Sequence, residues 1–186
     1  MKYPVTVYGD PLLRKKAKAI DKNYPNLSNI IENMWETMYH SDGVGLAAPQ
    51  IDLSIRLFIV DASPAADEDP ELANFKKVFI NPEILNRAGE EWVMNEGCLS
   101  LPEIREEVKR PDEVTIRYMD ENFEEHTETY KGYAGRVIQH EYDHLEGILF
   151  IDHLSPLRKR LLKGKLSNIA KGKVHPHYRI KIPAKK

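Results

Sequence analysis

The stretch Gln139-His140-Glu141-Tyr142-Asp143-His144 decides how the fold of this chain is interpreted. It contains the pattern H-E-x-x-H, in which two histidines four residues apart lie on one helix face, one turn from each other. Both imidazoles can then reach a single metal ion, and the glutamate after the first histidine can act as a general base. The alternative is a polar helix face with two solvated histidines. A third ligand elsewhere in the chain would distinguish the two interpretations.

Length and composition restrict the class of protein. The chain has 186 residues, of which 41% are hydrophobic and 30% are charged, and this is typical of one globular domain. It contains no apolar run of about 18 residues and no signal or transit pattern at residues 1–8, so we expect no membrane contact. A single cysteine excludes an intrachain disulfide and favours the cytoplasm.

Charge is distributed unevenly along the chain. Residues 155–186 contain eleven Lys or Arg and no acidic residue, whereas residues 1–154 contain 16 basic and 29 acidic residues. Such a tail is typical of contact with a polyanion, although a solvated helix face would also explain it. We expect a single domain over residues 1–186, with 155–186 as its basic C-terminal extension.

Helical signals fall in four places. Asp10-Pro11 predicts a short helix ending near Ile20, because Asp can cap it and Pro suits the first position. Stronger periodicity covers residues 27–40, ending at a glycine suited to a left-handed cap. The motif helix is expected from Gly132 to Gly147. Ser155-Pro156 should open a basic helix whose apolar stripe is Leu157, Leu161, Leu162, Leu166 and Ile169.

Strand signals lie mainly between the helices. Short apolar or alternating runs predict strands at 56–61, 78–80, 114–119 and 123–130, the last two as an antiparallel hairpin. Residues 62–74 are expected to form an exposed loop and residues 148–151 an extended apolar segment. The prediction is an α+β fold: antiparallel or mixed sheets around a central metal-binding HExxH helix, with N-terminal helices and a C-terminal basic helix.

Residues 43–50, Gly-Val-Gly-Leu-Ala-Ala-Pro-Gln, match the spacing of a dinucleotide-binding fingerprint, but we reject that interpretation. The fingerprint needs a strand before it and a helix after it. Here a helix comes first, and Pro49 interrupts any helix that follows. Two glycines among small residues instead indicate a backbone that another chain or a ligand can approach closely.

Known schemes for the third metal ligand can be tested against the sequence. The metzincin form requires a histidine at position 150, which is Phe150. A thermolysin-like site requires a carboxylate well downstream, but no acidic residue follows Asp152. The ligand must therefore come from upstream or from His153. The best candidate is Cys98, in a glycine-flanked turn, because one thiolate and two imidazoles leave an open coordination position, as catalytic sites require.

Three segments together resemble the signature motifs of bacterial peptide deformylases. They are residues 43–50, residues 96–100 (Glu-Gly-Cys-Leu-Ser) and the opening hexapeptide, and they occur in the order found in that family. The resemblance extends from about residue 3 to the helix after Ser155-Pro156. The 62–74 loop is longer than in compact members. The last dozen residues, which include His175 to Tyr178, match no part of the family pattern.

This resemblance implies hydrolysis of the formyl group from the N-terminal formylmethionine of new polypeptides, releasing formate. It implies that Cys98, His140 and His144 hold one divalent metal ion and that Glu141 handles the proton of the attacking water. The Gln50 side chain and the Leu99 backbone N–H would stabilise the developing oxyanion. The peptide would bind beside Val44, Gly45 and Gly97, and its methionine side chain would contact Met94, Tyr133 and Val137, for which simple core packing is an equally good explanation.

The resemblance also implies a cofactor and partners. Fe²⁺ is the expected ion, and Zn²⁺, Ni²⁺ or Co²⁺ also suit one thiolate and two imidazoles. The partners are formylmethionyl nascent peptides and, through the basic helix after Ser155, the RNA of the ribosome; we expect no DNA partner. Two alternatives stay open: a zincin-like metallopeptidase, which the missing downstream ligand disfavours, and a non-catalytic, metal-stabilised ribosome-binding module, which leaves Glu141 and Gln50 without a role.

Overall fold

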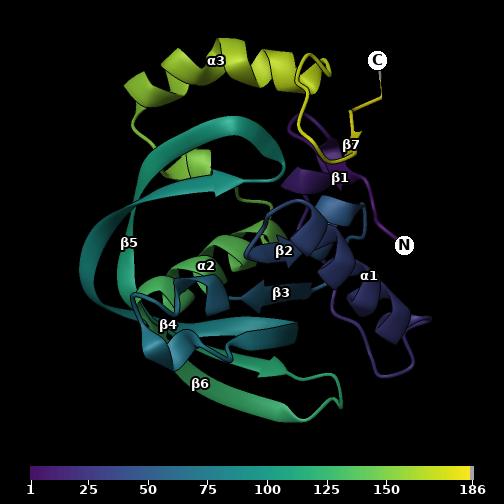
Figure 1. The fold of residues 1–186 in the computed structure, drawn as a ribbon, viewed down its shortest axis with the longest axis vertical. Helices are drawn as coiled ribbons and strands as arrows, with labels where there is room; N and C mark the ends of the chain where they lie inside the picture. Colours follow the sequence, from purple (N-terminus) through teal and green to yellow (C-terminus); the bar gives the residue numbers. More distant parts are fainter. Residues whose placement is uncertain (185–186) are drawn as a thin grey trace.

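Two β-sheets form the framework of the chain, as seen in the computed structural model, which describes residues 1–184 (Figure 1). The larger sheet has five antiparallel strands in the order β2-β3-β4-β5-β6. Their bounds are Gly45–Ala47, Leu57–Asp61, Lys76–Cys98, Leu101–Met119 and Glu125–Lys131. The smaller sheet pairs β1 (Val5–Thr6) in parallel with β7 (Ile180–Lys181), and so joins the two ends of the described chain.

Three α-helices accompany the sheets: α1 (Leu27–His40), α2 (Gly132–Leu145) and α3 (Pro156–Ala170). In Figure 1, α2 runs through the middle of the molecule and α3 lies across one end. α2 contacts β2, β3, β5 and β6. The predicted α+β class, the 27–40 helix, the 114–130 hairpin and the basic helix are confirmed. No helix in residues 1–184 is long and apolar enough to cross a membrane.

The helix expected from Asp10-Pro11 to near Ile20 is shorter than predicted. α1 is the only α-helix before the sheet in the described chain, and the segment after Asp10 is a single 3₁₀ turn, Pro11–Arg14. Asp10 caps it as expected, by accepting a hydrogen bond from the Leu12 N–H at 2.9 Å. The chain then becomes extended at Lys15, because the Ala17 N–H is used instead to bond the Leu145 carbonyl at the end of α2.

The long strand β4 also differs from the prediction, which ended a strand at Asn81-Pro82. β4 continues through this dipeptide, with a register shift against β5 between Ile80 and Glu83. Proline is tolerated at such a bulge because no ladder hydrogen bond is needed there. Asn81 takes a positive φ of 49°, and its side chain bonds the Ile20 backbone N–H and carbonyl at 2.9 and 2.7 Å. The contacts of the Asn81 side chain thus stabilise a bend within β4, at a dipeptide where the local sequence predicts the end of the strand.

Two further local predictions need correction. Residues 148–151 are not extended throughout: Phe150–His153 forms a 3₁₀ turn, with the Leu149 N–H bonded to the Asp152 carboxylate at 2.9 Å. At the end of α1, Asp42 rather than the following glycine adopts the left-handed conformation, with φ of 56°. The loop predicted at 62–74 is mostly exposed, as expected, and it contains two short 3₁₀ turns, Ser63–Ala65 and Pro70–Leu72.

The hydrophobic core lies on both sides of α2. On one side, Val137, Ile138 and Leu145 pack with Phe58 and Phe79 of the sheet. On the other, the buried face of α3, made of Leu162, Leu166 and Ile169, packs with β5 and the segment before α3. Leu157 and Leu161, which we expected in the same stripe, are 64% and 62% exposed. The first turns of α3 therefore present a mixed basic and apolar surface.

Candidate metal centre

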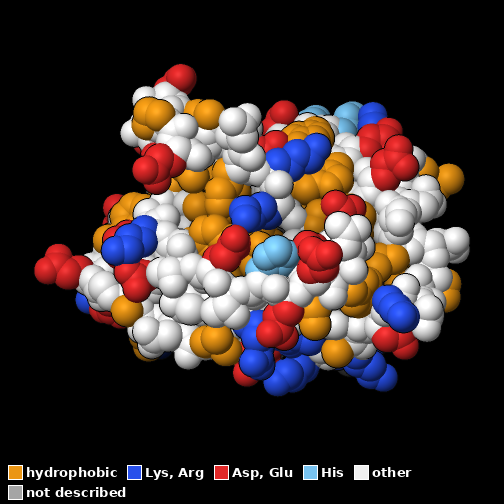
Figure 2. Space-filling view, turned by 90° about the horizontal axis from the view of Figure 1, so that it is seen from below, with side chains coloured by type: hydrophobic (Ala, Val, Ile, Leu, Met, Phe, Trp, Pro, Cys, Tyr) orange, Lys and Arg blue, Asp and Glu red, His pale blue; other side chains and the backbone are white. Residues whose placement is uncertain are grey.

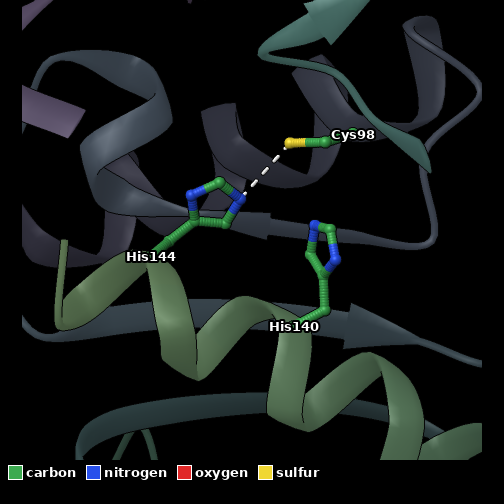
Figure 3. Close-up of side chains that lie close together, drawn as sticks. All are labelled: Cys98, His140 and His144. Atoms are coloured by element: carbon green, nitrogen blue, oxygen red, sulfur yellow. Dashed lines mark hydrogen bonds between the residues drawn. The ribbon is translucent and has the colours of Figure 1, made fainter. Parts of the chain in front are cut away.

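Cys98, His140 and His144 meet beside α2, as Figure 3 shows. One ligand atom from each lies within 4.8 Å of the other two. Cys98 Sγ is 3.3 Å from His144 Nε2, and the two imidazole centroids are 5.2 Å apart. The predicted third ligand therefore comes into contact with the histidine pair, although 42 residues separate it from His140 in the sequence.

Local structure explains this meeting. The i, i+4 spacing places both histidines on one face of α2, and that face points toward the β4–β5 turn. Cys98 ends β4 and pairs with Leu101 across the turn. The turn is held from outside by the Tyr8 N–H, which donates to the Ser100 carbonyl at 2.9 Å.

A buried carboxylate orients His140. Glu96 Oε1 is 2.8 Å from His140 Nδ1, which leaves Nε2 for the cluster. Burial opposes the charge on Glu96, but hydrogen bonds from His140 and Arg110 hold its pKa well below its ordinary value. Carboxylates commonly support metal-binding histidines in this way, by fixing the tautomer and the ring orientation.

Glu96 belongs to a buried ionic network that sequence reasoning missed. Arg110 donates to Glu96 Oε2 at 2.8 Å and to Asp143 Oδ2 at 2.8 Å. Arg136 donates to the same Glu96 oxygen at 3.0 Å. His153, the downstream alternative for the third ligand, lies 2.8 Å from Asp143 at the outer edge of the network instead. The sequence feature that could have predicted this network is a set of charged residues at inward-facing positions of β4, β5 and α2. These positions can be recognised as inward-facing only once the strand register is known.

Burial sets the protonation of the other two α2 residues. Desolvation lowers the pKa of His144 to about 3, and the charge of His140 adds to this shift, so His144 stays neutral. Neutral imidazole is the form that binds metals. Burial likewise raises the pKa of Glu141 to about 7; His140 opposes the shift and Glu96 adds to it. For His140, burial disfavours the charge, but hydrogen bonding to Cys98 and Glu96 raises its pKa well above its ordinary value.

Gln50, in the 3₁₀ turn Ala48–Ile51, also contacts Cys98. Its Oε1 accepts from the Ala47 N–H at 2.9 Å, which fixes the direction of the amide group. Its Nε2 then donates toward Cys98 Sγ at 3.4 Å and Ser100 Oγ at 3.2 Å. An N–H donor is thus aimed at the cluster from a residue that is 1% exposed.

The residues present fit a metal ion. Two nitrogen donors and one sulfur donor form an open three-ligand set, as catalytic sites use. Glu141 Oε2 and His144 Nδ1 are buried and have no hydrogen-bond partner within residues 1–184. An unpaired buried carboxylate oxygen is costly, and a neighbouring cation with its water would satisfy it.

A cavity of about 470 Å³ opens beside this cluster. All but one of the site residues predicted from the sequence line it: Val44, Gly45, Gln50, Met94, Gly97, Cys98, Leu99, Tyr133, Val137, His140 and Glu141. The exception, His144, does not line the cavity and is 1% exposed. Pro176 and Tyr178, from the C-terminal segment that matched no pattern, also line the cavity. Such a site, with three metal donors, a buried carboxylate and a concave pocket, is typical of metal-dependent hydrolases.

Comparison with known proteins identifies the family. The sequence profile of polypeptide deformylase matches residues 2–160. The peptide deformylase of Christiangramia forsetii is 57% identical, over 97% of this chain and 95% of its own length. The crystal structure of Thermotoga maritima peptide deformylase is 47% identical with a TM-score of 0.75, covering 84% of this chain and 99% of that one. The Met-Ala-Ser-bound crystal structure of a class I type b peptide deformylase from Acinetobacter baumannii is 34% identical with a TM-score of 0.75. It covers 83% of this chain and 99% of that one.

The chain belongs to the polypeptide deformylase family. Members of this family are metal-dependent hydrolases that remove the formyl group from nascent polypeptides. The metal dependence of this family agrees with the three donor residues that lie together at the cluster. Membership in the family does not favour the two alternative functions, a metallopeptidase and a non-catalytic binding module.

Proposed function

We propose that Cys98, His140 and His144 hold one divalent metal ion and that Glu141 is the acid–base residue of the deformylation. The observation that carries this assignment is the buried Glu141 carboxylate, with one oxygen unpaired, beside the Cys-His-His cluster. A divalent ion held by these residues would supply Lewis acidity, which would lower the pKa of water and polarise a carbonyl oxygen.

The chain's own residues then handle protons and charge. Glu141 takes a proton from water as the water oxygen bonds to the formyl carbon. Gln50 Nε2 and the Leu99 backbone N–H donate to the formyl oxygen as negative charge develops on it. When the C–N bond breaks, Glu141 passes its proton to the amine nitrogen, and formate and a free N-terminus result.

The peptide is expected to bind as an added strand beside Val44 and Gly45. β2 supports this proposal because it is an edge strand of the five-stranded sheet and borders the cavity. Strand addition recognises main chain more than side chains, as an enzyme acting on many nascent chains requires. The methionine side chain would enter the part of the cavity lined by Met94, Tyr133 and Val137. The related structure with Met-Ala-Ser bound supports a peptide of this kind at the site.

Substitution of Glu141 by Ala tests the acid–base role. We expect formate release from formyl-Met-Ala-Ser to be almost abolished while metal content stays that of wild type. Gln50→Ala should lower turnover by about 100-fold, because one oxyanion donor is lost. Near wild-type activity in metal-loaded Glu141→Ala would rule out the assignment.

The physiological ion is proposed to be Fe²⁺, which the family resemblance implies. A thiolate with two imidazoles accepts Fe²⁺, Zn²⁺, Ni²⁺ and Co²⁺, so the donor set supports a divalent transition metal without selecting one. Anaerobic reconstitution with iron should give higher activity and a shorter lifetime in air than reconstitution with zinc, because a ferrous centre and its thiolate oxidise. Equal activity and equal lifetime of the two forms would contradict iron.

Contact with the ribosome through α3 is a further part of the proposal. Arg160, Lys163 and Lys165 are exposed on this helix, whereas Arg158 pairs with Glu106 at 2.7 Å. The face turned away from α3 carries acidic and basic side chains intermixed (Figure 2). A basic helix would bind RNA phosphate with a strong salt dependence. Reversing the charge of these three residues should abolish co-sedimentation with ribosomes at low salt; unchanged co-sedimentation would rule this out.

The domain organisation and location follow from the same proposal. We expect residues 1–186 to act as one catalytic domain in the cytoplasm, where nascent chains emerge. The burial of Leu162, Leu166 and Ile169 in the same cluster as Leu101 supports treating the basic extension as part of this domain.

A further inference from the structure

The segment after α3 returns from the far end of the molecule to the catalytic pocket. It is anchored by β7, where the Arg179 and Lys181 carbonyls accept from the N–H groups of Val5 and Val7 at 2.9 and 3.1 Å. Val174, at the start of the segment, is buried in the core. The family profile ends at residue 160, so this segment lies beyond the part of the chain that the profile describes.

Between these anchors, residues 176–178 connect the two loops that border the cavity. The Tyr178 hydroxyl donates to the Leu99 carbonyl at 2.8 Å, in the turn that carries Cys98. On the other side, His177 Nε2 donates to the His40 carbonyl at 3.2 Å and lies 3.3 Å from Asp42 Oδ2. Burial raises the pKa of Tyr178, and negative charge at Cys98 and Glu103 adds to the shift, so the phenol remains a donor at neutral pH.

The path of a bound peptide leads toward this segment. A Cβ on Gly45 would lie 2.5 Å from the Glu141 carboxylate, so Gly45 marks the reacting end of the strand-binding edge. A Cβ on Gly43 would lie 3.1 Å from the Leu99 side chain. A peptide that leaves the reacting group along this edge therefore passes Gly43 and Leu99 next. Pro176 and Tyr178 line the cavity with those two residues.

We propose that Pro176 and Tyr178 form a wall of the subsite that receives the residue after formylmethionine, with Tyr178 as its specificity-determining residue. This inference rests on the proposed function, because it uses the reacting end defined by Glu141. The Tyr178 hydroxyl is already bonded to Leu99, so the aromatic ring is what contacts the substrate. The ring of a half-buried tyrosine offers apolar area at little entropic cost and favours an apolar side chain at that position.

The test compares two substrates that differ in length. Formylmethionine amide ends at methionine, whereas formyl-Met-Leu-Ser extends past Gly43. The proteins are the iron-loaded full-length wild type, Tyr178→Ala, Tyr178→Phe and a control, Arg179→Ala, whose exposed side chain does not line the cavity. For each, kcat and KM are measured by formate release, together with metal content and Tm.

We expect Tyr178→Ala to lower kcat/KM for the tripeptide about tenfold, mainly through KM, the effect of losing one aromatic contact. Its kcat/KM for formylmethionine amide should change by less than about twofold, because that substrate makes no contact there. Tyr178→Phe keeps the ring and should retain most of the preference for the tripeptide, and Arg179→Ala should behave as wild type.

Two results would overturn the inference. One is a tripeptide-to-amide ratio in Tyr178→Ala equal to that in Arg179→Ala. The other is an equal loss on both substrates at normal metal content, which would mean that Tyr178 only supports the Leu99 turn. If Tyr178→Ala does not fold, Tyr178→Leu keeps apolar bulk without the ring. The ratio of its kcat/KM values for the tripeptide and the amide is then compared with that of Arg179→Ala. Failure of the proposed function is distinguishable, because wild type would then release formate from neither substrate.

Discussion

Glu141 is the residue at which stability and activity conflict most directly. It is buried, and one of its oxygens has no hydrogen-bond partner within residues 1–184. Such a carboxylate destabilises the folded chain whenever it is ionised. The role of base proposed for Glu141 nevertheless requires the ionised form, so this role would retain the unfavourable charge.

Replacing this carboxyl by an amide should show the conflict as a pH dependence of stability. The pKa of Glu141 is raised from 4.5 to about 7 in the folded protein. A raised carboxyl pKa contributes stability below the unfolded value, and that stability is lost as pH rises through the folded value. Metal-free Glu141→Gln should therefore be more stable than metal-free wild type at pH 8 by on the order of 2 kcal/mol, and nearly equal at pH 5.

Urea unfolding at pH 5 and pH 8 in the presence of a chelator measures this difference. Glu32→Gln, on the exposed side of α1, is the matched control and should follow wild type. Parallel pH dependences of Glu141→Gln and wild type would contradict the expected burial effect.

Gly45 is the second residue whose identity the site requires. A Cβ at this position would lie 2.5 Å from Glu141 Oε1 and 2.8 Å from its Cδ, so the chain's own carboxylate occupies the space beside the backbone. Close approach of another chain or a ligand stays a prediction. Gly45→Ala should displace the carboxylate and lower kcat/KM by about 100-fold, the scale expected for a 1 Å misplacement of a reacting group. Metal content should not change, because the three ligands are not touched.

The control for this substitution is Gly164→Ala in α3, where nothing lies within 4 Å of the added carbon. It should leave activity unchanged and raise stability by about 0.5–1 kcal/mol through helix propensity. Formate release and thermal unfolding measured on both variants make the comparison. Wild-type kcat/KM in Gly45→Ala would show that the carboxylate can move without functional loss.

At the level of elements, α2 is joined to β4 and β5 by ionic contacts as well as by apolar packing. Glu96 of β4 contacts Arg110 of β5 and both Arg136 and His140 of α2. All of these side chains are at most 10% exposed. The network therefore sets the orientation of the α2 face that carries His140 and His144 relative to the turn that carries Cys98.

Neutralising the central carboxylate should weaken both the fold and the metal site. Glu96→Gln leaves two buried guanidinium groups with one less negative partner, which should cost about 3 kcal/mol of stability. Loss of the support for His140 should reduce metal affinity about 10- to 100-fold. Chemical unfolding and metal competition titrations measure these effects.

Glu83→Gln is the control at element scale, because Glu83 pairs with Arg117 on the exposed part of the same two strands. Exposed ion pairs contribute little, so its unfolding midpoint and metal affinity should remain those of wild type. If Glu96→Gln behaved like Glu83→Gln, the buried network would not be what orients His140.

For the whole molecule, buried acids with basic partners determine the behaviour at low pH. Hydrogen bonds and the charge of Arg110 hold the pKa of Glu96 and of Asp143 below their ordinary values, although burial alone would raise them. A depressed carboxyl pKa contributes stability above the unfolded value, and that stability is lost as pH falls toward the folded value. The metal-free protein should therefore lose stability steeply below about pH 4.

Urea unfolding at pH 7, 5, 4 and 3 tests this expected loss of stability at low pH. The decrease should be shallower in Glu96→Gln, which lacks one of the groups that must be protonated. A wild-type free energy of unfolding that stays constant from pH 5 to pH 3 would contradict the expected linkage.

The sequence alone determined the parts of this protein that depend on short-range spacing. The helix at 27–40, the motif helix, which was expected to reach Gly147 and ends at Leu145, and the 114–130 hairpin follow from periodicity and capping. The proposed ligand set of Cys98, His140 and His144 follows from donor chemistry. Tertiary structure decided what depends on distant partners. The Glu96–Arg110–Asp143 network, the passage of β4 through Asn81-Pro82 and the contact of Tyr178 with Leu99 join residues far apart in the chain. No local pattern encodes such contacts, because each forms only after the sheet register and the path of the C-terminal segment are set.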